Sequence, residues 1–269
     1  IYAQGIADNR YIPGMVSYWK FDEWTGTTAA DSADLNLGNL GTLYAPLPTW
    51  TTECKVGRGF QGHGALDFTP NPTTPPAAGD YVEVPTSTNL DINDEITIEA
   101  WIKPDAVDYY RTILSKYWNV GYYLRIRDGR VEFEAGWTTL SDVLIAPNNW
   151  YHIAGTYDGT VQKIYVNGVL VKSEALSYHL PIGVTAQNLV IGAQTVSHEL
   201  GFDGIIDEVA IFNRALTRTE IQQHYQNSLR GLQYWEGLPL ETLITTHINV
   251  YNPNHGLWVN GTKYYVQVL

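Results

Sequence analysis

Three short turn sequences limit the fold of this chain more than any other feature. Asp128-Gly129, Asn167-Gly168 and Asn260-Gly261 each lie between two runs in which apolar and polar residues alternate. Both central residues of a two-residue hairpin turn need positive φ, which Asn, Asp and Gly adopt at low cost. Alternation over several residues is the period of a strand with one buried face. The sequence therefore predicts three β-hairpins.

Similar strand patterns recur along the chain up to about residue 216. Examples are MVSYWKF (15–21), YVEVP (81–85) and EITIEAWIKP (95–104). The nineteen tyrosines, nine tryptophans and twenty-four glycines of the chain fit many strands and tight turns rather than helices. Short strands at a spacing of about 8–12 residues with such turns predict an all-β sandwich.

The patterned strands also contain residues that we assign to the core. Trp19, Trp101 and Trp150 alternate with other residues inside predicted strands, so we expect them to be buried. His152 stands in NWYHIAG, where it alternates with apolar residues. We interpret it as a packed histidine rather than a ligand.

One helix is predicted after the last strand of the series. Thr217 and Glu220 form a capping box, and Gly231 marks the end of the helix. The helix has a short apolar stripe, made of Ile221, Tyr225 and Leu229. We expect it to act as a packing lid over the strands.

The pattern changes again beyond residue 232, which divides the chain into three parts. We predict an N-terminal arm (1–12), a main domain (13–232) and a β-rich C-terminal extension (233–269). The arm has almost no core-forming pattern. The extension contains an alternating run and the Asn260-Gly261 hairpin, whose Asn260-Gly261-Thr262 is also a glycosylation sequon. We explain the Asn-Gly pair by the turn.

Charge and composition exclude several classes of function. The net charge is −12, so a polyanion such as DNA would be repelled. Cys54 is the single cysteine, so the chain has no intramolecular disulfide and no Cys-rich zinc site. No run reaches the length of about 18–20 apolar residues that a membrane helix needs. The first residue is Ile1 rather than Met, and we expect an extracellular or cell-surface protein whose signal peptide has been removed.

Several segments together resemble one known family. MVSYWKFDEWTGTTAADS, WYHIAGTYDG, YVNG and FDGIIDEVAIFNRALT are similar to laminin-G-like, concanavalin A-like lectin/glucanase domains, over roughly Pro13 to Tyr225. The resemblance implies a jelly-roll β-sandwich of two antiparallel sheets with one short C-terminal helix. It also implies that the first and last strands lie near each other.

Glucanases of this fold suggest a test for catalysis. They need paired carboxylates about 5–5.5 Å apart on one strand if they retain configuration. The pattern Glu-x-Asp-x-x-Glu is absent, and Glu132 and Glu134 in VEFEAGW are the nearest approach. With basic residues nearby, we interpret these two as a solvated face. The chain is therefore not expected to be an enzyme.

The resemblance also implies a possible Ca²⁺ site, since many relatives bind calcium near the junction of the first and last strands. Calcium takes six to eight oxygen ligands. The candidate ligands in this sequence are Asp22, Glu23, Asp31, Ser32, Asp207 and Glu208. The alternative is that Asp207 and Glu208 pair with Arg214 or with backbone donors and only hold the end of the sheet.

Aromatic side chains in loops are candidates for sugar binding. Their faces can stack on the apolar CH side of a pyranose ring. The candidates in or beside loops are Tyr109, Tyr110, Trp118 and Trp137. Each can equally be a lid over the core.

The C-terminal extension allows three placements: on its own sandwich, in a small second domain, or on the sheet of a neighbouring copy. The third is β-strand addition, and head-to-tail addition builds a filament unless it closes into a ring. The residues that would carry assembly are Ile244, Ile248, Val250, Trp258, Tyr264, Val266 and Val268.

Two functions follow from these observations. The first is a secreted, non-catalytic structural protein whose copies link into an extracellular filament or surface layer through their terminal strands. The second is a calcium-dependent carbohydrate-binding module or lectin that binds extracellular or cell-surface glycans. The extension favours the first, since a lectin does not need residues 233–269.

Overall fold

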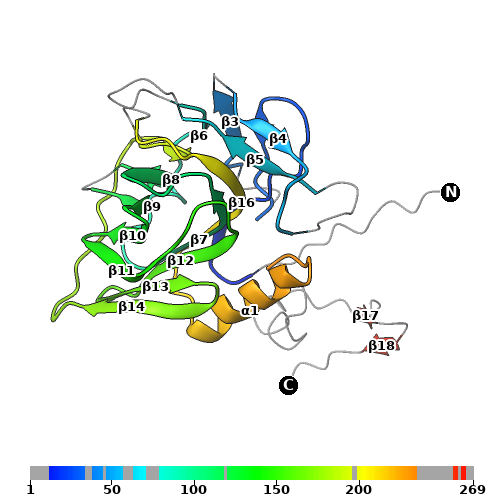
Figure 1. Cartoon of the computed structure of the whole chain (residues 1–269). Coiled ribbons are helices and arrows are strands. Elements are labelled where there is room, and N and C mark those ends of the chain that lie inside the picture. The colour runs from blue at the N-terminus through cyan, green and yellow to red at the C-terminus, as the bar shows by residue number, and fades with distance from the viewer. Residues whose placement is uncertain are drawn as a thin grey trace. The chain divides into compact units, whose positions relative to one another are not determined.

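A computed structural model of the chain describes residues 12–33, 38–44, 47–56, 63–70, 79–117, 120–195 and 199–234, and the strands Leu257–Val259 and Thr262–Tyr264. The chain forms two compact units, Ile1–Glu236 and Gly237–Leu269. The first unit contains two eight-stranded antiparallel sheets, sheet A and sheet B (Figure 1). This architecture confirms the predicted jelly-roll sandwich.

Sheet A has the order β14-β13-β12-β7-β16-β5-β4, and β1 also pairs with β16. Its strands are β1 (Met15–Trp19), β4 (Thr49–Thr51), β5 (Ala65–Phe68), β7 (Ile96–Pro104), β12 (Tyr151–Tyr157), β13 (Val161–Val166), β14 (Val169–Ala175) and β16 (Gly204–Phe212). Met15 pairs with Phe212 and Trp19 with Val209. The first and last strands of the sandwich are therefore neighbours, as the resemblance implied.

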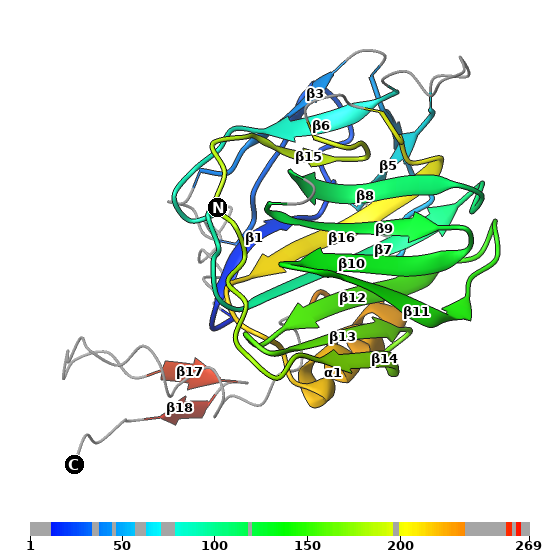
Figure 2. The same cartoon turned by 90° about the vertical axis from the view of Figure 1, so that its left-hand side faces the viewer.

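Sheet B has the order β11-β10-β9-β8-β15-β6-β3-β2 and faces the viewer in Figure 2. Its strands are β2 (Thr28–Ala29), β3 (Gly41–Tyr44), β6 (Tyr81–Val84), β8 (Tyr110–Lys116), β9 (Tyr122–Arg127), β10 (Arg130–Ala135), β11 (Thr138–Leu144) and β15 (Leu189–Ile191). The apolar core lies between the two sheets, with Ile98 and Ile153 from sheet A and Leu124 and Phe133 from sheet B.

The predicted hairpin turns are confirmed. Asp128 and Gly129 join β9 to β10 with φ of 48° and 75°, and Asn167 and Gly168 join β13 to β14 with φ of 52° and 74°. These are the positive values that a two-residue turn of twisted strands needs. In the second unit, β17 (Leu257–Val259) pairs with β18 (Thr262–Tyr264), which confirms the third hairpin, although its two turn residues lie outside the described residues.

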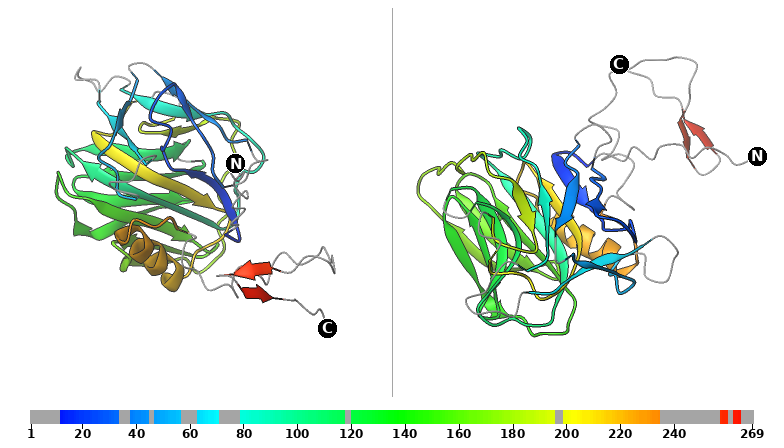
Figure 3. Two further views of the ribbon diagram at one scale, coloured as in Figure 1. Left: turned by 90° about the vertical axis from the view of Figure 1, so that its right-hand side faces the viewer. Right: turned by 90° about the horizontal axis from the view of Figure 1, so that it is seen from above.

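Helix α1 (Arg218–Leu229) begins at the predicted capping box. The Thr217 side chain accepts from the Glu220 amide, and the Glu220 side chain accepts from the Thr217 amide. Gly231 follows the helix with a φ of 74°. Figure 3 shows α1 lying along one side of the sandwich, on the outer face of sheet A.

The buried face of α1 differs from the predicted apolar stripe. Ile221 is buried, but Leu229 is 48% exposed. The other buried residues of the helix are polar: His224, Asn227 and Ser228. The stripe was wrong at Leu229 because the outer face of sheet A, on which α1 rests, presents polar as well as apolar side chains.

The main domain extends beyond residue 232, where the sequence indicates its end. Tyr234, which we assigned to the extension, is fully buried. Its ring stacks on Tyr18 of β1 at 5.3 Å and on His224 of α1 at 4.9 Å between centroids. Its hydroxyl donates to the Glu208 carbonyl oxygen. The packed domain therefore includes Tyr234.

Candidate functional site

The outer face of sheet B carries a cluster of arginine and tyrosine side chains. Tyr110 pairs with Arg127 between β8 and β9, and Arg125 pairs with Glu132 between β9 and β10. Since alternate residues of a strand point to the same face, these four side chains share the outer face with Tyr123. We call these five residues the arginine–tyrosine cluster.

Glu132 is the centre of this cluster and is fully buried. Its Oε1 accepts from Arg125 Nε at 2.7 Å and from the Tyr123 hydroxyl at 2.8 Å. Its Oε2 accepts from Arg127 Nη1 at 3.1 Å. Two guanidinium groups thus share one carboxylate. Burial and then the charge of Glu134 raise the pKa of Tyr123, so its hydroxyl stays protonated.

The prediction that Glu132 and Glu134 form a solvated face was wrong. Both are buried, because tyrosine and arginine side chains cover Glu132, while Glu134 accepts from Thr138 Oγ1 at 2.8 Å. The two oxygens of Glu132 are fully engaged by cations and a hydroxyl. This carboxylate is a structural anchor for Arg125 and Arg127.

Tyr109 and Tyr110 border the cluster at the start of β8. Arg125 Cζ lies 4.3 Å and Arg127 Cζ 5.5 Å from the Tyr110 ring centroid, close enough for cation–π attraction. The Tyr109 ring packs edge-on against Tyr110 at 5.0 Å, and 56% of Tyr109 is exposed. The Asp128 amide donates to the Tyr109 carbonyl oxygen at 2.9 Å and fixes the backbone there.

Tyr109 also has an unusual backbone conformation, with a φ of 55°. Left-handed backbone is rare for a bulky residue and costs free energy, and such residues gather at binding and catalytic sites. The structure thus holds an exposed aromatic ring in a strained position against Tyr110, whose own ring lies beside two arginines. Tyr109, Tyr110 and Arg127 form the candidate ligand platform.

The other two predicted sugar-binding residues do not join this platform. Trp137 is half-buried, packs against the core and meets Tyr157 edge-on at 5.1 Å. It follows β10 at the end of the strand far from the Asp128-Gly129 turn, so it is separated from Tyr110 by the length of the strand. Trp118 lies outside the described residues.

The predicted calcium ligands mostly accept hydrogen bonds from backbone amides. Asp22 accepts from Gly64, Glu23 from Ala30, Asp31 from Tyr18 and Asp207 from Lys55. The predicted alternative partner Arg214 pairs with Glu220 instead. Ser32 donates its own amide to the Tyr18 carbonyl oxygen.

No three His, Cys, Asp or Glu side chains within the described ranges form a group that could hold a metal ion. Burial, and to a smaller degree the charge of Asp22, raise the pKa of Asp207. Glu208 lies in the same irregular part of β16, with a φ of 54°. The calcium site stays a prediction.

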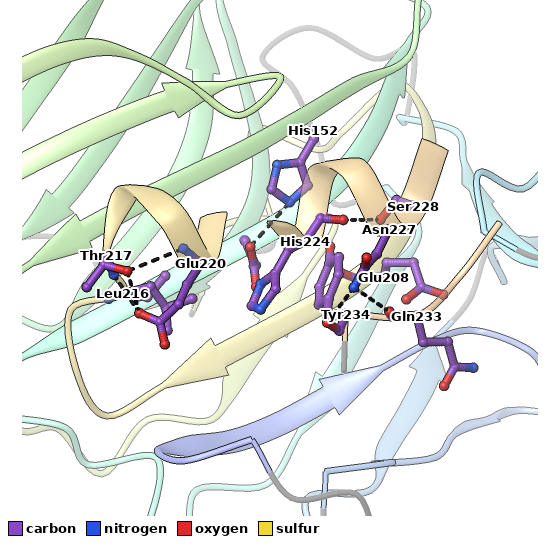
Figure 4. Close-up of polar contacts among 12 residues, drawn as sticks. His152, Glu208, Leu216, Thr217, Glu220, His224, Asn227, Ser228, Gln233 and Tyr234 are labelled. Atoms are coloured by element: carbon purple, nitrogen blue, oxygen red, sulfur yellow. Dashed lines mark hydrogen bonds and ion pairs between the residues drawn. The ribbon is translucent and has the colours of Figure 1, made fainter. Parts of the chain in front are cut away.

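A second polar cluster, which the sequence did not reveal, lies beneath α1. Glu99 of β7 is fully buried between two histidines. His224 Nδ1 of α1 lies 2.7 Å from its Oε1, and His152 Nε2 of β12 lies 3.2 Å from its Oε2. Figure 4 shows His152, His224 and Tyr234 gathered between the helix and the sheet. Burial alone would raise the pKa of Glu99, but the two histidines lower it to about 2.

From the sequence alone, only part of this cluster could be predicted. His152 is buried, as predicted, but it lies on the outer face of sheet A under α1 and not in the core between the sheets. Trp19 and Trp101 are buried as well, and Trp150 is half-buried. In ITIEAWIKP, Glu99 alternates with Ile98 and Ala100, which indicates an outward position but not the helix that covers it.

The predicted assembly residues are not part of any described site. Ile244, Ile248, Val250, Val266 and Val268 lie outside the described residues, whereas Trp258 and Tyr264 belong to β17 and β18, for which the structure gives the backbone pairing alone. In the part of the chain that the structure describes, no helix is long and apolar enough to span a membrane.

Two antiparallel sheets in this strand order define a β-sandwich of the jelly-roll type. A family model described as the concanavalin A-like lectin/glucanases superfamily matches residues 76–222, more than half of the chain. The chain belongs to this superfamily. The match confirms the resemblance that the sequence segments indicated.

Several known proteins are similar to this chain in sequence or in fold. Pappalysin-1 of Mus musculus is 32% identical over 89 residues, which are 32% of this chain and 5% of that protein. Domain 4 of AbnA, an extracellular GH43 arabinanase from Geobacillus stearothermophilus, was solved in complex with arabinotriose. Its structure matches this chain with a TM-score of 0.56 at 17% sequence identity, and the match covers 77% of this chain and 96% of the AbnA domain. The binding domain of botulinum neurotoxin serotype G has a TM-score of 0.53 at 17% identity, over 79% of this chain and 50% of that one.

These structural similarities concern the fold alone, because the identities are low. The chain spans only a small part of pappalysin-1 and about half of the neurotoxin domain. Laminin-G-like domains are typically extracellular, and the structural neighbours include a domain solved with arabinotriose and the binding domain of a neurotoxin.

Proposed function

We propose that this chain is a non-catalytic, extracellular domain that binds glycans at the Tyr109–Tyr110–Arg127 platform. The observation that carries the proposal is Tyr109, an exposed aromatic ring held at positive φ against Tyr110, whose ring lies beside Arg127. Aromatic faces stack on sugars, and guanidinium groups donate hydrogen bonds to hydroxyls. The AbnA domain with arabinotriose shows that a protein of similar fold holds a sugar.

The arginine–tyrosine cluster also supports a binding role over a catalytic one. A glycosidase needs one carboxyl group that can donate a proton and a second carboxylate as base or nucleophile. Glu132 has both oxygens engaged by Arg125, Arg127 and Tyr123. It instead holds Arg127 in place next to Tyr110, which reduces the loss of side-chain freedom on binding.

The test is a glycan array that includes arabino-oligosaccharides, followed by calorimetry with each sugar that binds. Tyr109→Ala is expected to weaken binding about tenfold, because it removes one stacking face. The matched control is Tyr178→Ala, since Tyr178 is 60% exposed in the β14–β15 connection. Equal affinity of Y109A and the unchanged protein, or no binding to any sugar, contradicts the proposal.

Self-assembly through the extension is a second candidate function. Gly237–Leu269 forms its own compact unit, and β17 and β18 pair only with each other among the described strands. A two-stranded hairpin alone is marginally stable in water, and strand addition to the sheet of another copy would complete it.

Electron microscopy over a wide range of dilutions tests assembly. Filaments that persist on dilution, and that are lost when residues 237–269 are deleted, support it. Single particles at every concentration contradict it and leave the glycan proposal unaffected.

Calcium binding is a separate proposal for the junction of β1 and β16. It rests on the carboxylates of Asp22 and Asp207, whose mutual repulsion a cation would relieve. Calorimetry with Ca²⁺ and thermal unfolding with and without chelator test it. No heat of binding and an unchanged Tm in chelator contradict it.

A further inference from the structure

A cavity of about 300 Å³ opens on the opposite side of the sandwich from the platform. Its walls come from three parts of the chain: Cys54 and Lys55 in the β4–β5 connection, Trp150 just before β12, and residues 228–231 at the end of α1. The volume is at the lower end of the range for small-molecule sites, about 300–1,000 Å³. It is large enough for a single sugar-sized molecule.

One wall of this cavity carries a hydrogen-bond donor. The indole Nε1 of Trp150 is buried and has no acceptor among the described residues. A buried N–H needs an acceptor, which water or a ligand can supply. An acceptor atom of a ligand in the cavity would satisfy it.

Two cations lie at the same place. Lys55 Nζ lies 4.4 Å from the ring centroid of Trp101, and Trp101 meets Trp150 edge-on at 6.4 Å. Arg230 is the exposed C-cap residue of α1. Among the described residues that line the cavity, none is Asp or Glu.

The C-terminal end of α1 repels an anion only weakly. A helix C-terminus carries a partial negative charge of roughly half an electron. Here the amides of Arg230 and Gly231 donate back to the Asn227 and Ser228 carbonyl oxygens. Lys55 and Arg230 bring cationic side chains to the cavity, and cations attract a negatively charged ligand.

We propose that this cavity is a binding site for a small organic carboxylate about the size of one sugar acid. Its carboxylate would accept from the Trp150 indole and the Lys55 and Arg230 cations. Its carbon skeleton would rest on Leu229 and the Trp150 ring. The site is distinct from the glycan platform, because it lies on the outer face of sheet A and not of sheet B.

The experiment is an NMR titration of the full chain that follows the indole ¹⁵N–¹H signals. The Trp150 signal is assigned by its loss in Trp150→Phe, which keeps an aromatic ring in the wall. The probes are glucuronate, gluconate and citrate, with glucose as the neutral counterpart of glucuronate. At least one carboxylate is expected to shift the Trp150 signal, and glucose is expected to leave it unchanged.

Charge variants then test the role of the cations. Lys55→Gln and Arg230→Gln are each expected to weaken carboxylate binding about tenfold, as for the loss of a charge-assisted hydrogen bond. Lys172→Gln is the matched control, because Lys172 lies on β14 in an exposed pair with Asp142. The proposal is overturned if no carboxylate shifts the Trp150 signal, if glucose shifts it equally, or if K55Q and R230Q both bind as the unchanged protein does.

Discussion

Glu99 carries a negative charge in a fully buried position, and this charge has a measurable consequence. The two histidines lower the pKa of Glu99 from 4.5 to about 2. Because the folded-state pKa is depressed, the ionised carboxylate contributes stability above its unfolded pKa and loses it as pH falls. A fall from 4.5 to about 2 corresponds to about 3 kcal/mol when the loss is complete.

We therefore predict an acid-dependent loss of stability that Glu99→Gln removes. Between about pH 5 and pH 2, the free energy of unfolding of the unchanged protein should fall by up to about 3 kcal/mol more than that of E99Q. Urea unfolding at a series of pH values measures this. Glu174→Gln, at an exposed position of β14, is the control and should keep the full dependence. Identical pH profiles for E99Q and the unchanged protein would exclude Glu99 as the cause.

Tyr109 allows a second prediction at the level of a single residue. Its φ of 55° costs free energy that an Asn would reduce, because Asn tolerates left-handed backbone. Tyr109→Asn is expected to raise the free energy of unfolding by up to about 1 kcal/mol and to weaken glycan binding at the same time. Urea unfolding and calorimetry measure the two effects. A destabilised Y109N would show that Tyr109 serves packing.

Residues whose role depends on side chains of a neighbouring strand were the hardest to predict. Glu132 and Glu134 looked like a solvated face, because the sequence shows the alternation of β10 but not Arg125 and Tyr123 on the next strand. Tyr109 and Tyr110 were identified as candidates because they stand together at a loop. Their strained backbone and their arginine partners could not be predicted from local sequence.

The capping box is the element-scale feature that the sequence predicted most completely, since all its parts lie within four residues. Thr217→Ala is expected to lower the free energy of unfolding by about 1 kcal/mol, the usual value for the loss of an N-cap side chain. Thr219→Ala, at an exposed position in the same first turn, is the control and should be neutral or slightly stabilising. Thermal or urea unfolding of both variants measures these changes in stability. Equal effects of T217A and T219A would contradict a specific capping role.

Elements as a whole were predictable where their signal is local and periodic. The turns at Asp128-Gly129 and Asn167-Gly168 follow from residue type alone. The buried face of α1 was not predictable, because it depends on what sheet A presents. The outer face of sheet A presents the carboxylate of Glu99, which requires a polar partner, and His224 of α1 supplies it.

At the scale of the whole molecule, the domain boundary gives a sharp prediction. Deleting residues 237–269 should leave a cooperatively folded domain, because Tyr234 and its stacking partners remain. Deleting residues 233–269 also removes the buried Tyr234 ring and is expected to cost about 3 kcal/mol more. Urea unfolding of both truncated chains measures the difference. Equal stability would place the boundary at residue 232, where the sequence put it.

The two-sheet architecture was predictable from strand spacing and from the resemblance, but the cavity at Trp150 was not. Its walls come from three segments that are far apart along the chain. None of these segments indicates a binding site by itself, since they are a lysine in a loop, a tryptophan before a strand and the end of a helix. Only the fold brings them to one place.

The pairing of β1 with β16 also determines when the sandwich can form. Met15 pairs with Phe212, so the N-terminal strand finds its partner only after nearly two hundred further residues have been made. β16 also pairs with β7 and β5, which places it within sheet A rather than at its edge. On the ribosome, β1, β5 and β7 therefore emerge with unpaired edges and wait for one late strand. Contacts this distant along the chain slow folding, and the unpaired edges are open to aggregation until residue 212 has left the exit tunnel.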